Sequence, residues 1–591
     1  MARPKKGSQN APAATDATKT EAPTASINIG LIFCGLLVFR LINALTIKTF
    51  FQPDEYFQSL EPALETAFGP SVNAWITWEW HERLRSSIHP LLFASVYSFA
   101  DTIAATLNLS QHARAEVLIA APKVLQAVFA ALTDAYTYRL ACDVYGTNDP
   151  AAFATYVLTV CSPWQWFASV RTLSNSLETT LTVIALRLWP WGMFFVSADK
   201  ESSRAKTTST QHYISLCAAA LACILRPTNL IIWATITAVL VVRHGGKQAM
   251  FNLAPMAFIC GTAVLAVSIA ADWAFYGELV LPPLRFLYFN VVRSLAVFYG
   301  KNRPDYYITE GLPLLLTTAV LFAVQAVWQA LRAPSTSTTP SEVRKNGTRF
   351  ALAMAVVTSV AILSLVSHKE VRFIYPLLPI LHVLAAAPVG EKFFGARASR
   401  NRFALFAVGI AIDIAIIYYT GYVHKRGVID VMHYLRHEHE KKLASASSSF
   451  GAGVVTTTVA FLMPCHSTPW RSHLIYPEID AGALSCEPPL HLAVDEREGY
   501  MDEADVFYAD PVAWIGENMA STETIRKGTH LDNVSSEKKD WPEYLAFFEQ
   551  LEPTIEQVLG DTRYHECWRG FNTHWHDDSR RKGDVIVWCL E

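Results

Sequence analysis

The chain has 591 residues, of which 51% are hydrophobic and only 17% are charged, and its net charge is −3. Because an average globular protein carries about 25% charged residues, the apolar residues here exceed what one soluble core can bury. This composition excludes a disordered chain, a coiled coil, a small disulfide scaffold and a nucleic-acid-binding protein that relies on excess basic charge. It indicates a polytopic α-helical membrane protein with an attached soluble part.

The first 423 residues carry the apolar segments. Residues 1–26 are rich in Ala, Thr and Pro and predict a disordered cytosolic tail, and the run 27–45 is interpreted as a retained first span. Residues 46–87 form a polar and aromatic loop, called the first loop below. Later runs are about as long as a segment needs to cross ~30 Å of hydrocarbon, and we predict a bundle of about 10 to 12 spans in all within residues 27–423. The later runs lie near 88–107, 115–141, 150–170, 175–198, 211–243, 252–276, 310–332, 350–367, 371–390 and 403–423.

The basic residues of short loops predict the orientation. Segments 332–349 and 391–402 each carry four Lys or Arg residues, which is typical of cytosolic loops. The loop at 367–370, the first loop and everything after the last span would then face the opposite, luminal side. If successive spans cross the membrane in alternate directions, the runs between residues 115 and 243 do not give consistent sides for their loops. One or two of those runs are therefore expected to be split or re-entrant. The run 211–243 contains Arg226-Pro227 and predicts a bent helix or a hairpin.

From about residue 424 the sequence predicts a soluble luminal α/β domain of residues 424–591. It begins with a polar helix. Residues 502–511 are interpreted as a strand followed by a turn, residues 541–560 as a helix, and residues 584–591 as a closing strand. Residues 453–465 alternate like a buried strand. Four cysteines of this part are spaced unlike a zinc site, and one or two disulfides of open connectivity are expected among Cys465, Cys486, Cys567 and Cys589. Of three glycosylation sequons, only Asn533 lies securely on the proposed luminal side.

Two adjacent carboxylates follow the first span in the sequence Gln52-Pro53-Asp54-Glu55. Pro53 fixes the backbone, and the carboxylates can occupy the first turn of a helix, where the helix dipole stabilises them. A simple capping role is the alternative. Because ionised groups beside a bilayer usually line a substrate path, we favour Asp54 and Glu55 as catalytic candidates.

A second group of ionisable residues lies between two late apolar runs, in His368-Lys369-Glu370-Val371-Arg372. Lys369 and Arg372 are three residues apart, so they could share one helical face and hold a phosphate. His368 could donate a hydrogen bond to the same anion. The alternative is a short solvated loop, which explains Glu370 better than it explains the cations.

Polar residues inside or beside the apolar runs are candidates for lining a substrate cavity, with buried ion pairs or snorkelling as the alternative. These residues are Arg85, His89, Arg171, Asn175, Glu178 and Glu370. Arg171 and Glu178 are seven residues apart and could pair. A carboxylate and cations on one side of a membrane suit attack of a hydroxyl on a sugar carbon whose leaving group is a phosphate. No convincing Asp-x-Asp metal motif is present, so we expect no metal and assign its role to the cations.

These motifs resemble the polyprenol-phosphate-mannose-dependent mannosyltransferases of the GT-C class. The resemblance rests on Gln-Pro-Asp-Glu, on Arg-Ser-Ser-Ile-His-Pro and on His-Lys-Glu-x-Arg-Phe. Longer stretches are similar to the branch that adds the third mannose of the glycosylphosphatidylinositol (GPI) anchor: residues 50–62, 74–80, 461–470 and 502–508. The match covers roughly residues 49–515.

The resemblance implies an endoplasmic-reticulum membrane enzyme with a luminal active site. It would transfer mannose from dolichyl-phosphate-mannose to the second mannose of the GPI precursor, in α-1,2 linkage and with inversion. It implies that Asp54 is the general base, that Glu55 supports the base or binds the acceptor, and that His368, Lys369 and Arg372 bind the donor phosphate. The lipid-linked donor, the GPI precursor and membrane lipid are the expected partners, with no nucleic acid, and the sequence identifies no protein partner.

Two alternatives remain open at this stage. One is a sister activity of the same class, which adds the fourth GPI mannose or extends the lipid-linked N-glycan precursor. The other is a polytopic lipid transporter or scramblase, which would hold its charges near the bilayer midplane. Asp54 and His368 lie at the ends of apolar runs, which disfavours the transporter.

Overall fold

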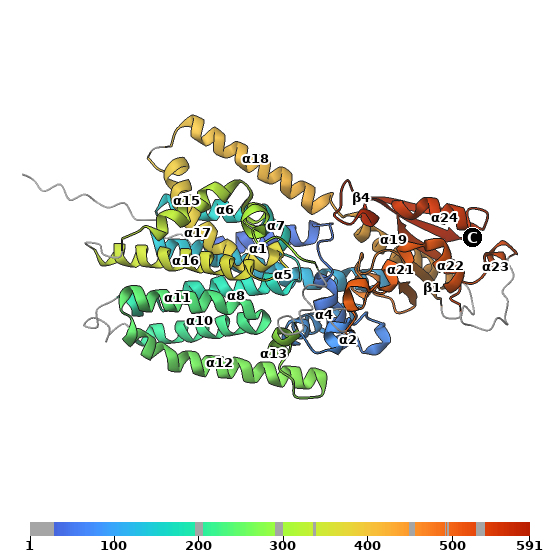
Figure 1. Cartoon of the computed structure of the whole chain (residues 1–591), viewed down its shortest axis with the longest axis horizontal. Helices are drawn as coiled ribbons and strands as arrows, with labels where there is room; N and C mark the ends of the chain where they lie inside the picture. Colours follow the sequence, from blue (N-terminus) through green and yellow to red (C-terminus); the bar gives the residue numbers. More distant parts are fainter. Residues whose placement is uncertain are drawn as a thin grey trace, which may run out of the picture.

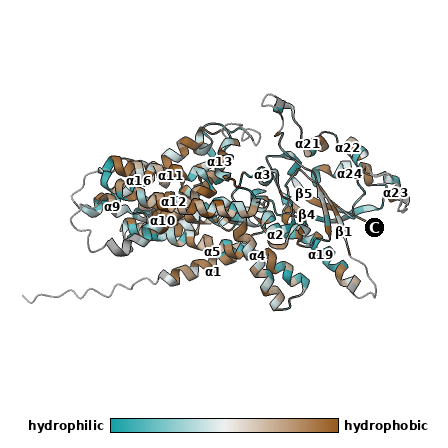
Figure 2. Ribbon diagram, turned by 90° about the horizontal axis from the view of Figure 1, so that it is seen from below, coloured by the Kyte–Doolittle hydropathy of each residue, from teal (hydrophilic) through white to brown (hydrophobic). Residues whose placement is uncertain are grey.

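The structure is a computed structural model that describes residues 29–195, 205–289, 300–334, 339–396, 398–447, 455–490, 492, 496–527 and 538–591. An elongated bundle of helices is joined at one end to a domain built on a five-stranded sheet (Figure 1). Hydrophobic residues dominate the helices of the bundle, whereas hydrophilic residues are frequent on the helices around the sheet (Figure 2). The predicted tail and the sequon at Asn533 lie outside the described residues.

The bundle is built from apolar helices of very different lengths. Its long helices are α1 (Ile29–Thr46), α4 (Ile88–Thr106), α5 (Gln111–Tyr145), α8 (Ser174–Leu188), α10 (Ala205–Leu225), α11 (Leu230–His244), α12 (Lys247–Tyr276), α15 (Val320–Leu331), α16 (Pro340–Ser364), α17 (Leu378–Val389) and α18 (Arg400–Tyr422). Shorter pieces connect them: α6 (Pro150–Val160), α7 (Pro163–Ala168), α9 (Trp191–Phe195), η4 (Pro227–Asn229), α13 (Pro282–Leu287), η7 (Tyr307–Gly311), α14 (Leu312–Leu316), η8 (Thr317–Ala319), η9 (Val371–Leu377) and η10 (Gly390–Phe394).

Seven helical segments of the described chain are long and apolar enough to cross a membrane: Ile88–Thr106, Gln111–Tyr145, Lys247–Tyr276, Tyr307–Leu331, Pro340–Ser364, Val371–Phe394 and Arg400–Ala446. Shorter apolar helices accompany them at Gly30–Thr46, Pro150–Val160 and Thr210–Leu225. The predicted class, a polytopic helical membrane protein with a C-terminal α/β domain, is therefore confirmed. The described residues contain seven segments long enough to cross a membrane, whereas the sequence predicted about 10 to 12 spans.

Two predicted spans are split by proline. The run 150–170 forms α6 and α7, because Ser162 accepts a hydrogen bond from the Gln165 N–H (3.3 Å) and starts a new helix at Pro163. The run 175–198 forms α8 and α9, because the residue before Pro190 is driven out of the helical conformation. The predicted irregularity between residues 115 and 243 lies at these breaks.

The run 211–243 forms a hairpin. In α10, Ser215 bonds the Ala185 carbonyl (2.7 Å), and Arg226 beyond its end bonds Asn175 (2.8 Å), so α10 runs antiparallel to α8. In α11, Trp233 stacks on Trp189 (5.3 Å between ring centroids), so α11 returns alongside α8. The reversal leaves the polar Arg226-Pro227-Thr228-Asn229 turn at the end of the bundle that faces the sheet domain.

The sheet domain comprises α19 (Gly427–Ser447) and the chain that follows it. Its strands β1 (Thr457–Leu462), β2 (Ile479–Ala483), β3 (Tyr544–Phe548), β4 (Tyr564–Thr573) and β5 (Gly583–Leu590) lie in the order β2-β1-β3-β5-β4. The β1 strand is parallel to β2 and β3, whereas β5 is antiparallel to β3 and β4. One face packs on α19, and the other packs on α21 (Glu503–Ala509), α22 (Pro511–Asn518) and α24 (Glu552–Leu559). Smaller elements are α20 (Arg471–Leu474), η11 (Glu496–Gly499), α23 (Thr522–Lys527), η12 (Glu549–Leu551) and η13 (Ser579–Arg581).

Two predictions for this domain are wrong. Residues 502–511 contain helix α21 rather than a strand, because the Asp502 side chain caps the N–H of Asp505 (2.7 Å). Residues 541–560 contain β3 before α24 rather than one helix. The β3 strand is central and all five of its residues are buried, so it lacks the alternation that marks a strand with one exposed face.

The first loop and the sheet domain share one hydrophobic core. The first loop contains η1 (Tyr56–Leu60, a wide π-type turn), α2 (Glu61–Phe68), η2 (Pro70–Val72) and α3 (Trp78–His81). Buried residues of this loop and of the sheet domain pack in the same cluster: Phe50, Tyr56, Phe57, Leu60 and Leu64 with Met432, Phe461, Trp470, Leu474 and Ala546. The sheet domain therefore covers the segment that carries Asp54 and Glu55.

Two disulfides staple the sheet domain. Cys465 is bonded to Cys486, across loops that follow β1 and β2, and Cys567 is bonded to Cys589, across the β4–β5 pair. The expected disulfides are thus both present, and the structure gives the connectivity that the sequence left open.

Replacing both Cys567 and Cys589 by Ala is expected to lower the free energy of unfolding of the sheet domain by about 3 kcal/mol, because the bond closes a loop of 22 residues. Thermal denaturation of the purified full chain, monitored by far-ultraviolet circular dichroism, measures the change. Replacing the free Cys34 by Ala is the control and should change nothing. An unchanged melting temperature in the double variant would contradict the stapling role.

Candidate active site

Asp54 lies where the first loop meets the end of the bundle. The chain leaves α1, turns at Pro53 and enters a helical turn at Asp54, as the sequence predicted. Asp54 Oδ2 accepts a hydrogen bond from Arg372 Nη1 at 2.5 Å, although the two residues are 318 positions apart. The first carboxylate of the Pro-Asp-Glu motif and the late cationic segment therefore meet in one site.

Glu55 points to the other side of this turn, into the bundle. Its Oε2 accepts from Arg171 Nη1 at 3.1 Å, and Arg171 also donates to the Thr49 carbonyl at 2.7 Å and to the Thr49 hydroxyl at 3.0 Å. Burial raises the pKa of Glu55, and the positive charge of Arg171 opposes that shift. The predicted pairing of Arg171 with Glu178 is wrong, because Arg171 lies just before α8 and its side chain turns back to the first loop.

Arg372 is the centre of the second group. Its Nε and Nη2 donate to the two carboxylate oxygens of Glu370, both at 2.7 Å, in a bidentate pair, while Nη1 reaches Asp54. His368 Nε2 lies 3.0 Å from Glu370 Oε1, and Gln52 Nε2 donates to Glu370 Oε2 at 3.4 Å. Burial raises the pKa of Glu370, but Arg372 and His368 together outweigh it and lower this pKa to about 2. Glu370 is thus a fixed anion that orients Arg372.

Lys369 takes a different direction. It is buried, and its Nζ donates to the Asn302 carbonyl at 3.3 Å while its backbone N–H donates to the Asn302 side chain at 2.9 Å. The expectation that Lys369 and Arg372 share a helical face is wrong, because the 3₁₀ segment η9 begins only at Val371. Lys369 fixes the neighbouring segment rather than joining the Asp54–Arg372 contact.

The remaining candidates surround this contact. Arg226 donates to Asn175 Oδ1 at 2.8 Å and lies 5.9 Å from the Phe373 ring, while Asn229 donates to Glu178 Oε1 at 2.8 Å. Arg85 pairs with Glu79 at 2.8 Å and lies within electrostatic range of Asp54 and Arg372. His89 is buried in the first turn of α4. The guanidinium groups of Arg226 and Arg372 lie 5.9 and 5.6 Å from the centroid of the Phe373 ring, and the charges of Arg85, Arg226 and Arg372 act on one another and on Asp54.

Sequence reasoning missed the acidic residues that hold these cations and loops. Glu79 binds both Arg85 and Gln58. Asp272 of α12 accepts from the backbone N–H and hydroxyl of Ser87 at 2.6 and 2.8 Å, and thereby anchors the Arg-Ser-Ser-Ile-His-Pro segment. Asp272 stands inside an apolar run, and a lone acid at that position was the signal that could have identified it.

Two clusters of metal-ligating side chains occur among the described residues, and both lie outside the Asp54–Arg372 contact. In the first, Cys465 and Cys486 are joined in a disulfide beside His466. In the second, which comprises His112, Glu116 and His437, Arg436 donates to Glu116 and lies 3.4 Å from His437 Nε2. A disulfide removes the thiolates and a guanidinium repels a cation, so neither donor set suits a metal ion.

A comparison with protein families identifies the family of the chain that carries this site. The model of the Alg9-like mannosyltransferase family matches residues 31–475, a range that contains Asp54, Arg171, Arg226 and Arg372. The chain belongs to this family.

Known mannosyltransferases resemble the chain over most of its length. "GPI mannosyltransferase 3" of Aspergillus fumigatus is 46% identical and the alignment covers 97% of this chain and 79% of that protein. The protein of the same name from Gibberella zeae is 42% identical, with 94% of both chains covered. "GPI alpha-1,2-mannosyltransferase 3" of Mus musculus is 30% identical, and the alignment covers 93% of this chain and 87% of that protein.

The solved structure of ArnT from Cupriavidus metallidurans bound to undecaprenyl phosphate has the same fold. The TM-score is 0.52 with 95% of this chain and 97% of that chain covered, although only 11% of the residues are identical. The predicted GT-C architecture is therefore confirmed, and the chain is a glycosyltransferase of the Alg9-like family with an ArnT-like fold.

Proposed function

We propose that this chain transfers mannose from dolichyl-phosphate-mannose to the second mannose of the GPI precursor, forming an α-1,2 bond and adding the third mannose. Family membership supports mannosyl transfer, and the names of the relatives that cover nearly the whole chain support the GPI acceptor and the linkage. The observation that carries the mechanism is the contact between Asp54 and Arg372, which joins a base to a phosphate-binding cation.

Asp54 acts as the general base in this proposal. It takes the proton from the acceptor hydroxyl as the hydroxyl oxygen attacks the anomeric carbon of the donor mannose. The bond from that carbon to the phosphate oxygen breaks, and its electron pair leaves with dolichyl phosphate. One displacement converts the β-linked donor into an α-linked product.

The three guanidinium groups stabilise the phosphate that leaves. Arg372 has five N–H donors, and its bonds to Asp54 and Glu370 use three of them, so it retains capacity for phosphate oxygens. Arg85 and Arg226 supply further positive charge, and His368 can donate to the same anion. Glu55 supports the turn through Arg171, and Lys369 supports the segment before Arg372.

The site faces the lumen of the endoplasmic reticulum in this proposal. The described residues of the basic segments 332–349 and 391–402 lie toward the end of the bundle away from the sheet domain (Figure 1), and such segments favour the cytosol. The two disulfides of the sheet domain favour an oxidising compartment for the opposite end.

The purified chain is expected to convert a synthetic two-mannose GPI precursor and labelled dolichyl-phosphate-mannose into a three-mannose product. An α-1,2-specific mannosidase should release the label. The lipid-linked N-glycan precursor and a three-mannose GPI precursor are the control acceptors and should not be labelled. Labelling of either control in place of the two-mannose precursor would replace this function with that sister activity.

A further inference from the structure

A cleft of about 480 Å³ lies between the first loop and the sheet domain, outside the contacts described for the active site. The first loop contributes Asn73, Ala74, Trp75, Ile76 and His81, and the sheet domain contributes Trp470 and Ala483. The volume is in the range of small-molecule sites, which combine aromatic walls with a few polar groups. No Asp, Glu, Lys or Arg is among its described lining residues, so the cleft suits a neutral polar ligand.

Two buried ionisable side chains, Glu61 and Arg471, connect the walls of this cleft. Glu61 accepts from the backbone N–H of Trp75 at 3.3 Å and from that of Ser472 at 2.9 Å. From the other wall, Arg471 Nε donates to the carbonyl of Asn73 at 3.2 Å. Burial raises the pKa of Glu61 to about 7, against the effect of these N–H donors. Because buried polar groups are costly unless they are hydrogen-bonded, these bonds between the first loop and the sheet domain fix the spacing of the two walls.

Aromatic contacts lead from this cleft toward Asp54. The Trp75 ring packs edge-on against Trp470 (5.1 Å) and against Phe57 (5.4 Å), and Phe57 lies three residues after Asp54. These rings form a continuous wall from the cleft to the helical turn that carries the proposed base.

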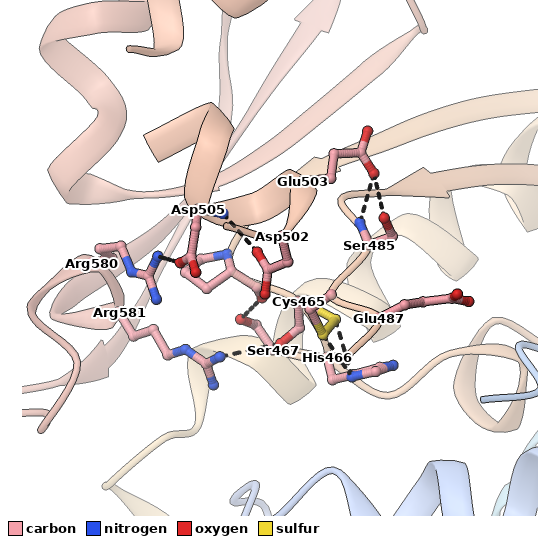
Figure 3. Close-up of a disulfide and its surroundings, with 12 residues drawn as sticks. Cys465, His466, Ser467, Ser485, Glu487, Asp502, Glu503, Asp505, Arg580 and Arg581 are labelled. Atoms are coloured by element: carbon pink, nitrogen blue, oxygen red, sulfur yellow. Dashed lines mark hydrogen bonds and ion pairs between the residues drawn. A yellow bond between two sulfur atoms is a disulfide. The ribbon is translucent and has the colours of Figure 1, made fainter. Parts of the chain in front are cut away.

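His466 completes this wall. Its ring lies 4.6 Å from Trp75 and 4.3 Å from Phe57, and its Nδ1 lies 3.1 Å from Cys465 Sγ. Figure 3 shows the imidazole against the disulfide, on the side away from the Asp505–Arg580 pair. Burial and then Arg581 lower the pKa of His466 to about 4, and the charge of Asp54 acts in the opposite direction. The contact between Phe57 and His466 therefore connects this wall to the turn that carries Asp54.

We propose that the cleft binds a neutral hexose of the acceptor glycan, one that lies inward of the mannose that receives the new sugar. The apolar C–H face of the pyranose packs on the indole of the half-buried Trp75, which the buried Trp470 supports from behind, and its hydroxyl groups bond the Asn73 amide and the His81 imidazole. The inference rests on the proposed function, and it explains why the sheet domain is held against the first loop.

Ala483→Trp tests the inference by filling the cleft without removing a contact. The expected result is a rise of about tenfold or more in KM for the two-mannose precursor, the size expected when a central aromatic contact is lost, with kcat and the donor KM unchanged. Gly482→Trp is the matched control, because it adds the same side chain one position earlier on β2 at a site that meets open space. Asn73→Gly, which keeps the left-handed backbone (φ 55°) and removes the amide, should raise the acceptor KM in the same direction.

The results separate this inference from the proposed function. Wild-type acceptor KM in both Ala483→Trp and Asn73→Gly, or an equal rise in donor and acceptor KM, would overturn the cleft assignment alone. A wild-type chain that forms no three-mannose product would overturn the proposed function and this inference with it.

Discussion

Asp54→Asn is expected to lower kcat by about 10²–10⁴-fold, the contribution of a positioned general base, while donor and acceptor binding change little. Asparagine has nearly the same shape and can still accept a hydrogen bond from Arg372, so the loss isolates the proton acceptor. Single-turnover transfer from labelled dolichyl-phosphate-mannose measures the effect on the purified full chain.

The matched control is Asp305→Asn, which removes a carboxylate whose partner Arg303 is exposed on the surface. Its kcat should stay at the wild-type value, and both variants should elute as the wild type does in size-exclusion chromatography. Wild-type turnover by Asp54→Asn would refute the assignment of the base.

Arg171→Met is expected to lower the free energy of unfolding by about 3–5 kcal/mol, because it leaves the buried carboxylate of Glu55 without its cation. The same change removes both hydrogen bonds to Thr49, so the turn between α1 and Asp54 should loosen as well. Thermal denaturation in detergent measures the loss.

Adding Glu55→Gln to Arg171→Met removes the unpaired charge and should recover part of the melting temperature. Arg426→Met is the comparison, since the Arg426–Asp430 pair is partly exposed and such pairs contribute about 0–1 kcal/mol. If Arg171→Met and Arg426→Met had the same melting temperature, the Arg171–Glu55 pair would not be a structural support of the site.

The helical architecture followed from the sequence because crossing a bilayer requires long apolar segments. Hydropathy averages over many residues, so it joined α6 to α7 and α8 to α9 across Ser162-Pro163 and Trp189-Pro190, where local capping and proline sterics end a helix. The central strand β3 was taken for part of a helix for a related reason. Both of its faces are covered, and an element covered on both faces shows no polar alternation.

The candidate site could be predicted in part. Motif recognition and loop orientation placed Asp54 and Arg372 on one side of the membrane, and the structure brings them into contact. Sequence spacing failed for Lys369 and Arg171, because spacing describes neighbours on a regular helix and both residues lie outside one. The supports Glu79 and Asp272 were missed, since Asp272 meets Ser87 across 185 residues and no local pattern reports such a contact.

The core shared by the first loop and the sheet domain also sets an order of assembly. During synthesis the ribosome releases residues 46–87 well before the residues of the sheet domain that share their core, which lie between Val428 and Val587. The apolar face of the nascent loop therefore stays uncovered until the sheet domain is synthesised, and chaperones in the compartment that receives it have a defined surface to protect. A transferase truncated before its final strands would be left with an unfinished catalytic segment rather than with a trimmed accessory domain.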